Sequence, residues 1–242
     1  MREIDPKMVA DRYNSMETIW NRTDRWHLWT ESRIGNFISN VFSKNKEFHN
    51  FKILNAGSGG NSYGINENNI LHIDIAGSKI SHLKNSLISD LHQIPLTDKE
   101  FDMILCVGSV INYCDPIVVI SEFNRLIKPN GYLLLEFENS RTFELLGKPG
   151  FNKKAALVKT FFNNESELIW FFSESYIKQI VNLNGYKIVR LKRFHIISPL
   201  IYRVFKFENV AARFAWLDSL FSFLPFIRKF SSNTILLLRK SK

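Results

Sequence analysis

A short loop with three glycines is the densest group of residues in this chain that could bind a ligand. It reads Asn-Ala-Gly-Ser-Gly-Gly over residues 55–60. Glycines allow positive φ and carry no Cβ, so the backbone N–H groups of such a loop can approach a ligand closely. Asp74 follows Gly57 by seventeen residues, and a carboxylate there can accept both hydroxyl protons of a ribose. The two features predict a nucleoside site; a surface turn is the alternative interpretation of Asp74.

Two classes of cofactor use such a loop, and the residues that follow separate them. The nicotinamide fingerprint is G-x-G-x-x-G/A, whereas Ser62 stands in the third small position here. That fingerprint also leaves two later features unexplained, Asp90-Leu91 and the apolar run at residues 101–105. The loop alone therefore does not identify the cofactor, and the nicotinamide hypothesis fits the rest of the chain poorly.

Strands that alternate with helices would position this loop. Apolar runs predict seven strands, at residues 51–56, 71–75, 86–89, 101–107, 132–137, 186–196 and 234–238. The run at 132–137 is continuous, which is typical of a central strand covered on both faces. This order predicts a mostly parallel sheet with helices on both faces. A ligand is then expected at the carboxyl ends of the strands.

Spacing and caps mark the first two predicted helices. Apolar residues at helical spacing predict an amphipathic helix around residues 34–42. Asp115 and Pro116 suit the N-cap and first position of a second helix, and Lys-Pro-Asn-Gly at 128–131 ends it. The predicted buried face of this second helix is Ile117, Ile120, Phe123, Leu126 and Ile127.

The second half of the chain is less regular. Ser173 can cap a third helix, which Gly185 closes. Residues 139–164 show no clear pattern, and residues 197–233 form an insertion rich in phenylalanine. Within it, apolar residues at helical spacing over 211–230 fit packing against the sheet, a lid or dimer face around an apolar acceptor, or docking on a membrane surface.

Five segments, in unchanged order, resemble the class I S-adenosylmethionine-dependent methyltransferases. They are residues 54–60, 72–75, 89–91, 101–113 and 125–132. The resemblance implies an α/β, three-layer, Rossmann-like fold, in which a seven-stranded, mostly parallel sheet has an antiparallel last strand.

The same resemblance implies a single methyltransferase domain over residues 1–242. Its expected parts are an N-terminal helical cap at 1–48, a cofactor-binding core at 50–140, and substrate-side or lid insertions at 141–164 and 197–233, the second being a helical insertion between the last two strands.

Carried over residue by residue, the resemblance implies S-adenosyl-L-methionine as the cofactor. Gly57, Ser58 and Gly59 would line its methionine moiety, and Asp74 would hold its ribose. Asp90 would bond the adenine amino group. The full expected set is Asn55, Ala56, Gly57, Ser58, Gly59, Asp74, Ile75, Ser89, Asp90, Leu91, Val107, Gly108 and Ser109, of which Leu91 offers a backbone N–H to adenine and the last three face the sulfonium.

The chain departs from the family pattern in two places. Asn55 stands where the family commonly has Asp or Glu. Its amide can bond the loop or the ligand, but it lacks the charge that attracts an ammonium. The segment from Gly57 to Asp74 is also short, so a helix there must be short or irregular.

The acceptor side is less defined. A sulfonium methyl group is already activated, so the protein mainly has to place a nucleophile in line with the S–CH3 bond, and a general base helps a protonated acceptor. The candidate catalytic residues are Tyr113, His195 and Glu138. Each has a structural alternative. Tyr113 can be a wall residue, His195 a hydrogen-bonded histidine of the core, and Glu138 a partner of Arg141. The candidate substrate-side residues are Trp20, Trp26, His27, Asn112 and Arg141, and packing of the N-terminal helices is the alternative for the first three.

Three functions remain open on the sequence. The first is methyl transfer to a small molecule or a peptide. The second is transfer of the 3-amino-3-carboxypropyl group of the same cofactor. The third is an RNA-binding module on this fold, although Gly108 to Tyr113 contains no Asn/Asp-Pro-Pro-Tyr/Phe motif for base methylation. No Cys/His cluster has metal-ligand spacing, so no metal is expected.

Composition limits the partners. The 242 residues carry a net charge of +9, but Lys and Arg are spread along the chain. Nucleic acid is therefore not favoured as a partner, and it is not excluded. No apolar run is long enough to span a bilayer, which leaves peripheral membrane contact open. We expect a cytoplasmic, bacterial protein, monomeric or homodimeric, whose two cysteines are free.

Overall fold

A seven-stranded sheet forms the centre of the computed structural model, which describes residues 4–20, 23–162, 165–205 and 208–241. The strands, in their order across the sheet, are β3 (Ser86–Ile88), β2 (Ile70–Asp74), β1 (Ile53–Ala56), β4 (Phe101–Cys106), β5 (Ile127–Glu138), β9 (Asn233–Lys240) and β8 (Tyr186–Phe194). Neighbouring strands pair in parallel from β3 to β5, whereas β9 is antiparallel to both β5 and β8. The predicted sheet with its antiparallel last strand is confirmed.

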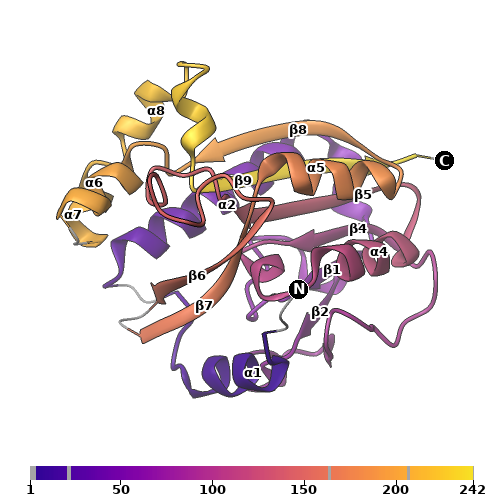
Figure 1. The fold of residues 1–242 in the computed structure, drawn as a ribbon. Helices are drawn as coiled ribbons and strands as arrows, with labels where there is room; N and C mark the ends of the chain where they lie inside the picture. Colours follow the sequence, from indigo (N-terminus) through magenta and orange to yellow (C-terminus); the bar gives the residue numbers. More distant parts are fainter. Residues whose placement is uncertain (1–3, 21–22, 163–164, 206–207, 242) are drawn as a thin grey trace.

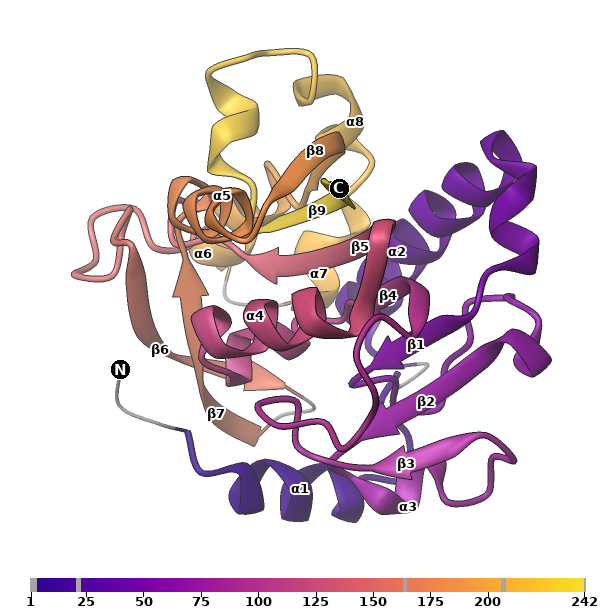
Figure 2. The same ribbon diagram turned by 90° about the vertical axis from the view of Figure 1, so that its right-hand side faces the viewer.

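Helices cover both faces of this sheet (Figures 1 and 2). The α-helices are α1 (Pro6–Ser15), α2 (Arg25–Lys44), α3 (Gly77–Ile80), α4 (Pro116–Leu126), α5 (Glu174–Leu183), α6 (Ser198–Phe205), α7 (Glu208–Arg213) and α8 (Leu217–Phe221). Short 3-10 helices are η1 (Lys46–Asn50), η2 (Glu67–Asn69), η3 (Val110–Tyr113) and η4 (Ile227–Phe230). One apolar core lies between the sheet and α4 with α5, and a second lies between the sheet and α2.

Caps predicted from the sequence begin two of these helices. The Asp115 carboxylate accepts from the N–H of Ile117 at the start of α4, and the Ser173 hydroxyl accepts from the N–H of Tyr176 at the start of α5. The predicted face of α4 is wrong at two positions. Ile117 is 52% exposed, and Val119 is buried instead; Ile127 is buried but belongs to β5. Ile117 lies in the first turn, in which Pro116 is the buried residue.

A two-stranded antiparallel sheet was missed. β6 (Ala155–Phe162) and β7 (Glu165–Phe172) pair with each other and lie beside the main sheet (Figure 1). The second half of β6 and most of β7 do not alternate strictly between apolar and polar residues, so the period that marks a half-buried strand is weak there. Residues 139–164, for which no pattern was recognised, thus contain β6. The β6–β7 pair supplies one wall of the site described below.

Strand ends differ from the predicted ones by a few residues. β8 ends at Phe194, and His195 follows with φ of 52°, outside the strand. β5 begins at Ile127, so residues 128–131 continue into the strand after ending the helix, with Asn130 at φ of 64°. Between Gly57 and Asp74 the only helical turn is η2, which agrees with the short or irregular segment expected there.

The Phe-rich insertion forms α6, α7, α8 and η4 at one end of the molecule (Figure 1). Its buried side includes Ala211, Ala215 and Asp218, while Phe214, Leu220 and Leu224 are exposed. Packing of those three side chains against the sheet, one of the expectations from their spacing, is therefore wrong.

Candidate active site

A large cavity opens where the carboxyl ends of β1, β2 and β4 meet. The empty space within it, counted with its open mouth, is about 1590 Å³. α1 and the start of α2 contribute to its lining, and β6 and β7 contribute Thr160 and Glu167. The cofactor residues expected from the sequence that line it are Gly57, Ser58, Gly59, Asp74, Ile75, Ser89, Asp90, Leu91, Val107, Gly108 and Ser109. Eleven residues from four separate segments are thus brought together at one site.

The glycine loop is held in a shape that needs glycine. Gly57 has φ of 68° and Gly59 has φ of 53°. A Cβ on Gly57 would lie 2.4 Å from Cγ1 of Val110. The N–H groups of Gly57 and Ser58 both donate to the carbonyl of Ile73, at 2.7 and 3.1 Å. The loop after β1 is therefore fixed to β2, with its glycines on the cavity wall.

Asp74 joins this loop to the end of β2. Its Oδ2 accepts a 2.8 Å hydrogen bond from the N–H of Gly59, and its Oδ1 accepts one of 2.9 Å from the N–H of Ala76. Burial raises the pKa of Asp74, and these N–H donors partly offset the effect. A carboxyl group thus lies on the cavity wall where a ribose was expected.

Asn55 and Ala56 lie behind the loop and do not line the cavity. Asn55 is buried, and its Nδ2 donates to the carbonyl of Asn61 at 2.7 Å. Its Oδ1 has no hydrogen-bond partner among the described residues. The amide therefore braces the far end of the glycine loop, and direct contact with a ligand ammonium, one of the options its position left open, has no support in this geometry.

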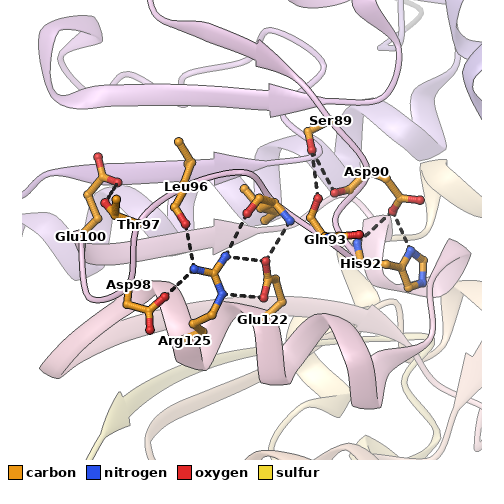
Figure 3. Close-up of polar contacts among 11 residues, drawn as sticks. Ser89, Asp90, His92, Gln93, Leu96, Thr97, Asp98, Glu100, Glu122 and Arg125 are labelled. Atoms are coloured by element: carbon orange, nitrogen blue, oxygen red, sulfur yellow. Dashed lines mark hydrogen bonds and ion pairs between the residues drawn. The ribbon is translucent and has the colours of Figure 1, made fainter.

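A histidine that the sequence did not single out lies beside Asp90 (Figure 3). Oδ1 of Asp90 accepts from the backbone N–H of His92 at 2.9 Å and lies 2.6 Å from its Nδ1. The N–H of Asp115 donates to Nε2 of His92 at 3.0 Å. Because Nε2 accepts, the ring proton lies on Nδ1 and points at Asp90. His92 thereby links the Asp90 loop to the start of α4.

Arg125 fixes the rest of the segment after Asp90 to α4 (Figure 3). Its guanidinium donates to the carbonyls of Ile94 and Leu96 at 2.9 and 2.7 Å. It also pairs with Glu122 and Asp98, at 2.7 Å each. Hydrogen bonding to Arg125 lowers the pKa of Glu122. A planar guanidinium with five N–H donors can hold several points of a loop at once, so Arg125 supports the Asp90 side of the cavity.

A buried glutamate in β5 holds the loop after β4. Gly108 and Ser109 have φ of 79° and 60°. Oε2 of Glu136 accepts from the N–H of Ser109 at 2.7 Å, and Oε1 accepts from the Asn233 amide at 2.8 Å. Burial raises the pKa of Glu136. The sequence signal for this residue was a single acidic side chain inside the otherwise apolar run at residues 132–137.

The far end of the cavity is built from tyrosines and glutamates. The Tyr113 hydroxyl donates to Oε2 of Glu167 at 2.7 Å and lies 2.9 Å from the hydroxyl of Tyr13. Arg12 pairs with the same Glu167 oxygen at 3.3 Å. Burial raises the pKa of Tyr113 well above its ordinary value, so its hydroxyl keeps its proton. Tyr13 and Glu167 are a hundred and fifty-four residues apart in sequence, and neither was predicted.

Two further carboxyl groups face this end. Glu138 and Glu144 both line the cavity, and the Ser109 hydroxyl donates to Oε1 of Glu138 at 3.1 Å. Burial, followed by the nearby charges of Glu144 and Glu136, raises the pKa of Glu138 well above its ordinary value.

The N-terminal segment covers one side of the cavity. A Cβ on Gly59 would lie 2.2 Å from Cδ1 of Ile19, and one on Gly108 would lie 3.6 Å from the ring of Trp20. Trp26 and His27 also line the cavity. The Asp24 carboxylate caps α2 by accepting from the backbone N–H groups of Trp26 and His27. It also contacts Nδ1 of the His27 ring. Residues 19 and 20 thus cover both glycine-bearing loops.

Comparisons with known proteins agree with this geometry. The family model for the methyltransferase domain matches residues 54–135, the stretch that supplies the glycine loop, Asp74, Asp90 and the loop after β4. Residues 54–135 are therefore similar to this methyltransferase domain, and solved S-adenosylmethionine-dependent methyltransferases share the fold of the chain. S-adenosyl-L-methionine is the cofactor expected in this family.

Solved structures share the fold at low sequence identity. A protein from Pyrococcus horikoshii is 14% identical, with 96% of this chain and 99% of that one covered and a TM-score of 0.59. An S-adenosylmethionine-dependent methyltransferase from Clostridium acetobutylicum is 11% identical, with 98% and 99% covered and a TM-score of 0.55. The [4+2]-cyclase SpnF is 14% identical, with 79% and 74% covered and a TM-score of 0.50. No curated protein sequence matches the chain significantly.

The residues present fit the family cofactor. The glycines bring bare backbone to the cavity wall, where a Cβ would collide with a neighbour at Gly57 and Gly59. Asp74 and Asp90 place carboxyl groups on the same wall. Among the described residues, no group of three or more His, Cys, Asp or Glu side chains could hold a metal ion. In the same part of the chain, no helix is long and apolar enough to cross a membrane.

Three predicted acceptor-side residues of this methyltransferase fold do not line the cavity. His195 is buried, with Nε2 2.8 Å from the Thr30 hydroxyl and Nδ1 3.1 Å from the Ser198 hydroxyl. Asn112 is buried and accepts from the N–H of Glu138 at 3.1 Å. The Arg141 guanidinium lies over the ring of Phe230, 5.0 Å from its centre. Of the catalytic candidates, Tyr113 and Glu138 remain at the cavity.

Proposed function

We propose that this protein is an S-adenosylmethionine-dependent methyltransferase that acts on a small-molecule or peptide acceptor. One observation carries the proposal: the cavity runs without interruption from the glycine loop to the tyrosines and glutamates on the acceptor side. α1, the β6–β7 pair and residues 19–20 contribute walls to this second part. A chamber enclosed in this way favours an acceptor that enters it whole, or a peptide end, over a large folded partner.

The cofactor contacts proposed here follow the lining. Gly57, Ser58 and Gly59 would hold the methionine moiety, and Asp74 the ribose. Asp90 and the N–H of Leu91 would hold the adenine, with His92 orienting Asp90 through its Nδ1 proton. When bound, S-adenosylmethionine supplies an electrophilic methyl group, and Val107, Gly108 and Ser109 would face its sulfonium.

On the acceptor side, the roles of Glu138 and Tyr113 follow from their environments. Glu138 is a carboxyl group with a raised pKa, accessible from the cavity, which suits a group that takes a proton from the acceptor. Tyr113 keeps its proton, so it would orient an acceptor as a hydrogen-bond donor and would not act as a base. His195 is not proposed as a catalyst, because its side chain does not line the cavity and both of its ring nitrogens are engaged by hydroxyl groups.

The test identifies the sulfur by-product and the labelled acceptor. The protein is incubated with methyl-labelled S-adenosylmethionine and a cell extract separated into small-molecule, peptide and RNA fractions. We expect S-adenosylhomocysteine to form and label to appear in the small-molecule or peptide fraction. Formation of methylthioadenosine would instead identify aminocarboxypropyl transfer. Label in RNA, or salt-sensitive RNA retention without turnover, would favour the third hypothesis.

Two observations bear on the aminocarboxypropyl alternative. The amide at position 55, where the family commonly has Asp or Glu, favoured an unusual binding mode for the amino-acid end of the cofactor. Asn55 lies behind the loop and bonds Asn61, so this argument for the alternative is weakened. The fold itself does not decide, since the structurally similar SpnF is a [4+2]-cyclase. The by-product assay therefore remains necessary. The cytoplasmic location and the monomeric or homodimeric state stay predictions.

A further inference from the structure

A buried carboxyl group lies directly behind the loop that follows β4. Glu136 is fully buried in β5 and does not line the cavity, whereas Gly108 and Ser109 do. Its Oε2 accepts from the N–H of Ser109 at 2.7 Å, and the N–H of Gly108 is a further donor to the same carboxyl group. The backbone of the loop therefore lies between Glu136 and the cavity, at the place where the sulfonium of the cofactor is proposed to bind.

The contacts of Glu136 suit its charged form. Backbone N–H groups only donate, so Oε2 is an acceptor, and Oε1 accepts from the Asn233 amide at 2.8 Å. Hydrogen bonds donated to a carboxyl group favour its ionised form. Burial raises the pKa of Glu136, and the three donors act against that rise. The geometry around Glu136 is therefore that of a carboxylate held by N–H groups.

The charge of Glu136 acts on groups that line the cavity. Tyr63 and Glu138 are both lining residues. Burial, followed by the charge of Glu136, raises the pKa of Tyr63. Burial, followed by the charges of Glu144 and Glu136, raises the pKa of Glu138 well above its ordinary value. Both effects are repulsion between negative charges, so a positive group at the same wall would be attracted by Glu136.

We propose that Glu136 selects the charged form of the cofactor: its carboxylate, acting through the loop at residues 107–109, favours the sulfonium of S-adenosylmethionine over the neutral sulfur of S-adenosylhomocysteine. This proposal rests on the proposed function, because it assigns a role to a residue behind the same cofactor site. Glu136 touches neither ligand, so it is a positioning residue that acts through its charge and is not a catalytic residue.

Selection by charge has a consequence for turnover. Loss of the methyl group converts the sulfonium into a neutral thioether, so the attraction by Glu136 ends with the reaction. The spent cofactor then lacks this part of the binding free energy that held the fresh one. An interaction of this kind stabilises bound S-adenosylmethionine and not the transition state, so it favours exchange of the cofactor and does not accelerate the chemical step.

Bracing of the loop is the alternative role for Glu136, since its hydrogen bonds hold Gly108 and Ser109 at φ of 79° and 60°. Bracing alone would affect both ligands equally, because they differ only by a methyl group and its charge. The ratio of the two affinities therefore separates charge selection from bracing, whereas either affinity by itself does not.

Calorimetry with the two ligands tests the proposal. Glu136→Gln removes the charge but keeps an oxygen for the N–H of Ser109, and its amide can donate to Asn233 once the Asn233 amide turns over. Both dissociation constants are measured at neutral pH for wild type and variant. We expect affinity for S-adenosylmethionine to fall about five- to tenfold relative to that for S-adenosylhomocysteine, the scale of one partly screened charge acting over several ångströms.

Two further variants keep the outcomes separate. Glu174→Gln removes a partly buried carboxylate that pairs with Arg193 and Lys178 and does not line the cavity, so the ratio should stay at the wild-type value. Glu136→Asp keeps the charge but withdraws the carboxylate by one methylene group. It should weaken both ligands together and leave their ratio close to that of the wild type.

The outcomes decide between the two roles. An unchanged ratio in Glu136→Gln, or an equal loss of both affinities, would overturn charge selection and leave bracing as the role of Glu136. Thermal melting of each variant shows whether it is folded. Should Glu136→Gln fail to fold, Glu136→Asp decides, because a ratio that shifts against S-adenosylmethionine although the charge is kept would overturn the proposal. Absence of binding of both ligands to the wild type would instead count against the proposed function.

Discussion

The backbone N–H of Gly59 donates a 2.8 Å hydrogen bond to the carboxylate of Asp74. This bond joins the loop after β1 to the end of β2, the two places where the methionine moiety and the ribose of the cofactor are proposed to bind. The other carboxylate oxygen of Asp74 accepts from the N–H of Ala76. One side chain therefore shapes the glycine loop and presents acceptor oxygens to the cavity, so a change at Asp74 affects both the loop and the ligand.

Replacing Asp74 with alanine should weaken binding of S-adenosylmethionine by about 1–3 kcal/mol, the scale for leaving buried polar partners unpaired. Isothermal titration calorimetry measures the change, and Asp11→Ala, an exposed aspartate on α1, is the matched control. An unchanged affinity in Asp74→Ala would contradict the ribose assignment. Micromolar binding of NAD by the wild type, without binding of S-adenosylmethionine, would contradict the cofactor itself.

Replacing Tyr113 with phenylalanine should destabilise the protein. The Tyr113 hydroxyl donates to Glu167 and contacts the Tyr13 hydroxyl, and all three groups are partly buried at the cavity wall. Loss of this hydroxyl leaves buried polar partners less satisfied, which costs about 1–3 kcal/mol of the free energy of unfolding. Urea denaturation of wild type and variant measures the difference.

Tyr176→Phe provides the matched control for that experiment. Tyr176 is only partly buried and does not line the cavity, so the free energy of unfolding should change little. Equal stabilities of Tyr113→Phe and the wild type would show that the Tyr113 hydroxyl contributes nothing to the fold, and the contact between α1 and β7 would then depend on other interactions, such as the ion pair of Arg12 with Glu167.

The sequence predicted the parts of the fold that depend on local patterns. Asp115 and Pro116 mark the start of α4 by chemistry confined to one helical turn, and the seven sheet strands were found because apolar runs are local. The exposed Ile117 shows the limit of such patterns: spacing identifies a helix face, but only the approach angle of the helix decides where its first turn is buried.

The site residues that belong to a local sequence motif were predicted, and those that depend on contacts between distant segments were missed. Gly57 follows β1, Asp74 ends β2 and Asp90 follows β3, and the geometry of a parallel sheet brings them together. Tyr13, Tyr113 and Glu167 are joined by hydrogen bonds but come from three separate elements. No local sequence pattern predicts such a contact. The β6–β7 pair that carries Glu167 was itself not predicted, so its contribution to the cavity could not be.

Replacing His195 with asparagine should change how stability depends on pH. Burial lowers the pKa of His195 to about 3, from an ordinary value of about 6.5. The unfolded chain therefore takes up a proton at His195 below pH 6.5, whereas the folded protein does not. The contribution of His195 to the free energy of unfolding is therefore fully present above pH 6.5 and is lost as the pH falls toward 3.

Asparagine does not titrate, so the variant lacks this loss. We expect His195→Asn to be less stable than the wild type at pH 7.5, because the contacts with Thr30 and the stacked ring of Trp26, 4.0 Å between centres, are disturbed. The gap in melting temperature should narrow as the pH falls from 6.5 to 4. Differential scanning fluorimetry across this range measures it, and a gap independent of pH would show that the histidine is accessible to protons in the folded protein.

The exposed aromatic residues of the Phe-rich insertion should bind the protein to anionic membranes. Phe223 is 80% exposed and Phe226 is 79% exposed, and the exposed cations Arg213, Arg228 and Lys229 lie in the same insertion. Apolar rings that enter the interface, combined with cations that attract anionic headgroups, favour a phosphatidylserine-containing surface. We expect wild-type protein to sediment with vesicles of phosphatidylcholine and phosphatidylserine, less with phosphatidylcholine alone, and less at high salt.

Substitution of both rings tests which surface is responsible. Phe223→Ser combined with Phe226→Ser should abolish sedimentation with the vesicles, whereas Leu183→Ser should not, because Leu183 is a 78% exposed apolar residue at the end of α5, outside the insertion. Equal sedimentation with both vesicle types would contradict the preference for anionic lipid, and no sedimentation with either would contradict membrane docking. Size-exclusion chromatography of the same variants tests the remaining interpretation. A wild-type dimer that becomes monomeric in the double variant would identify the insertion as a dimer face, because removal of two exposed rings also weakens an apolar interface between copies.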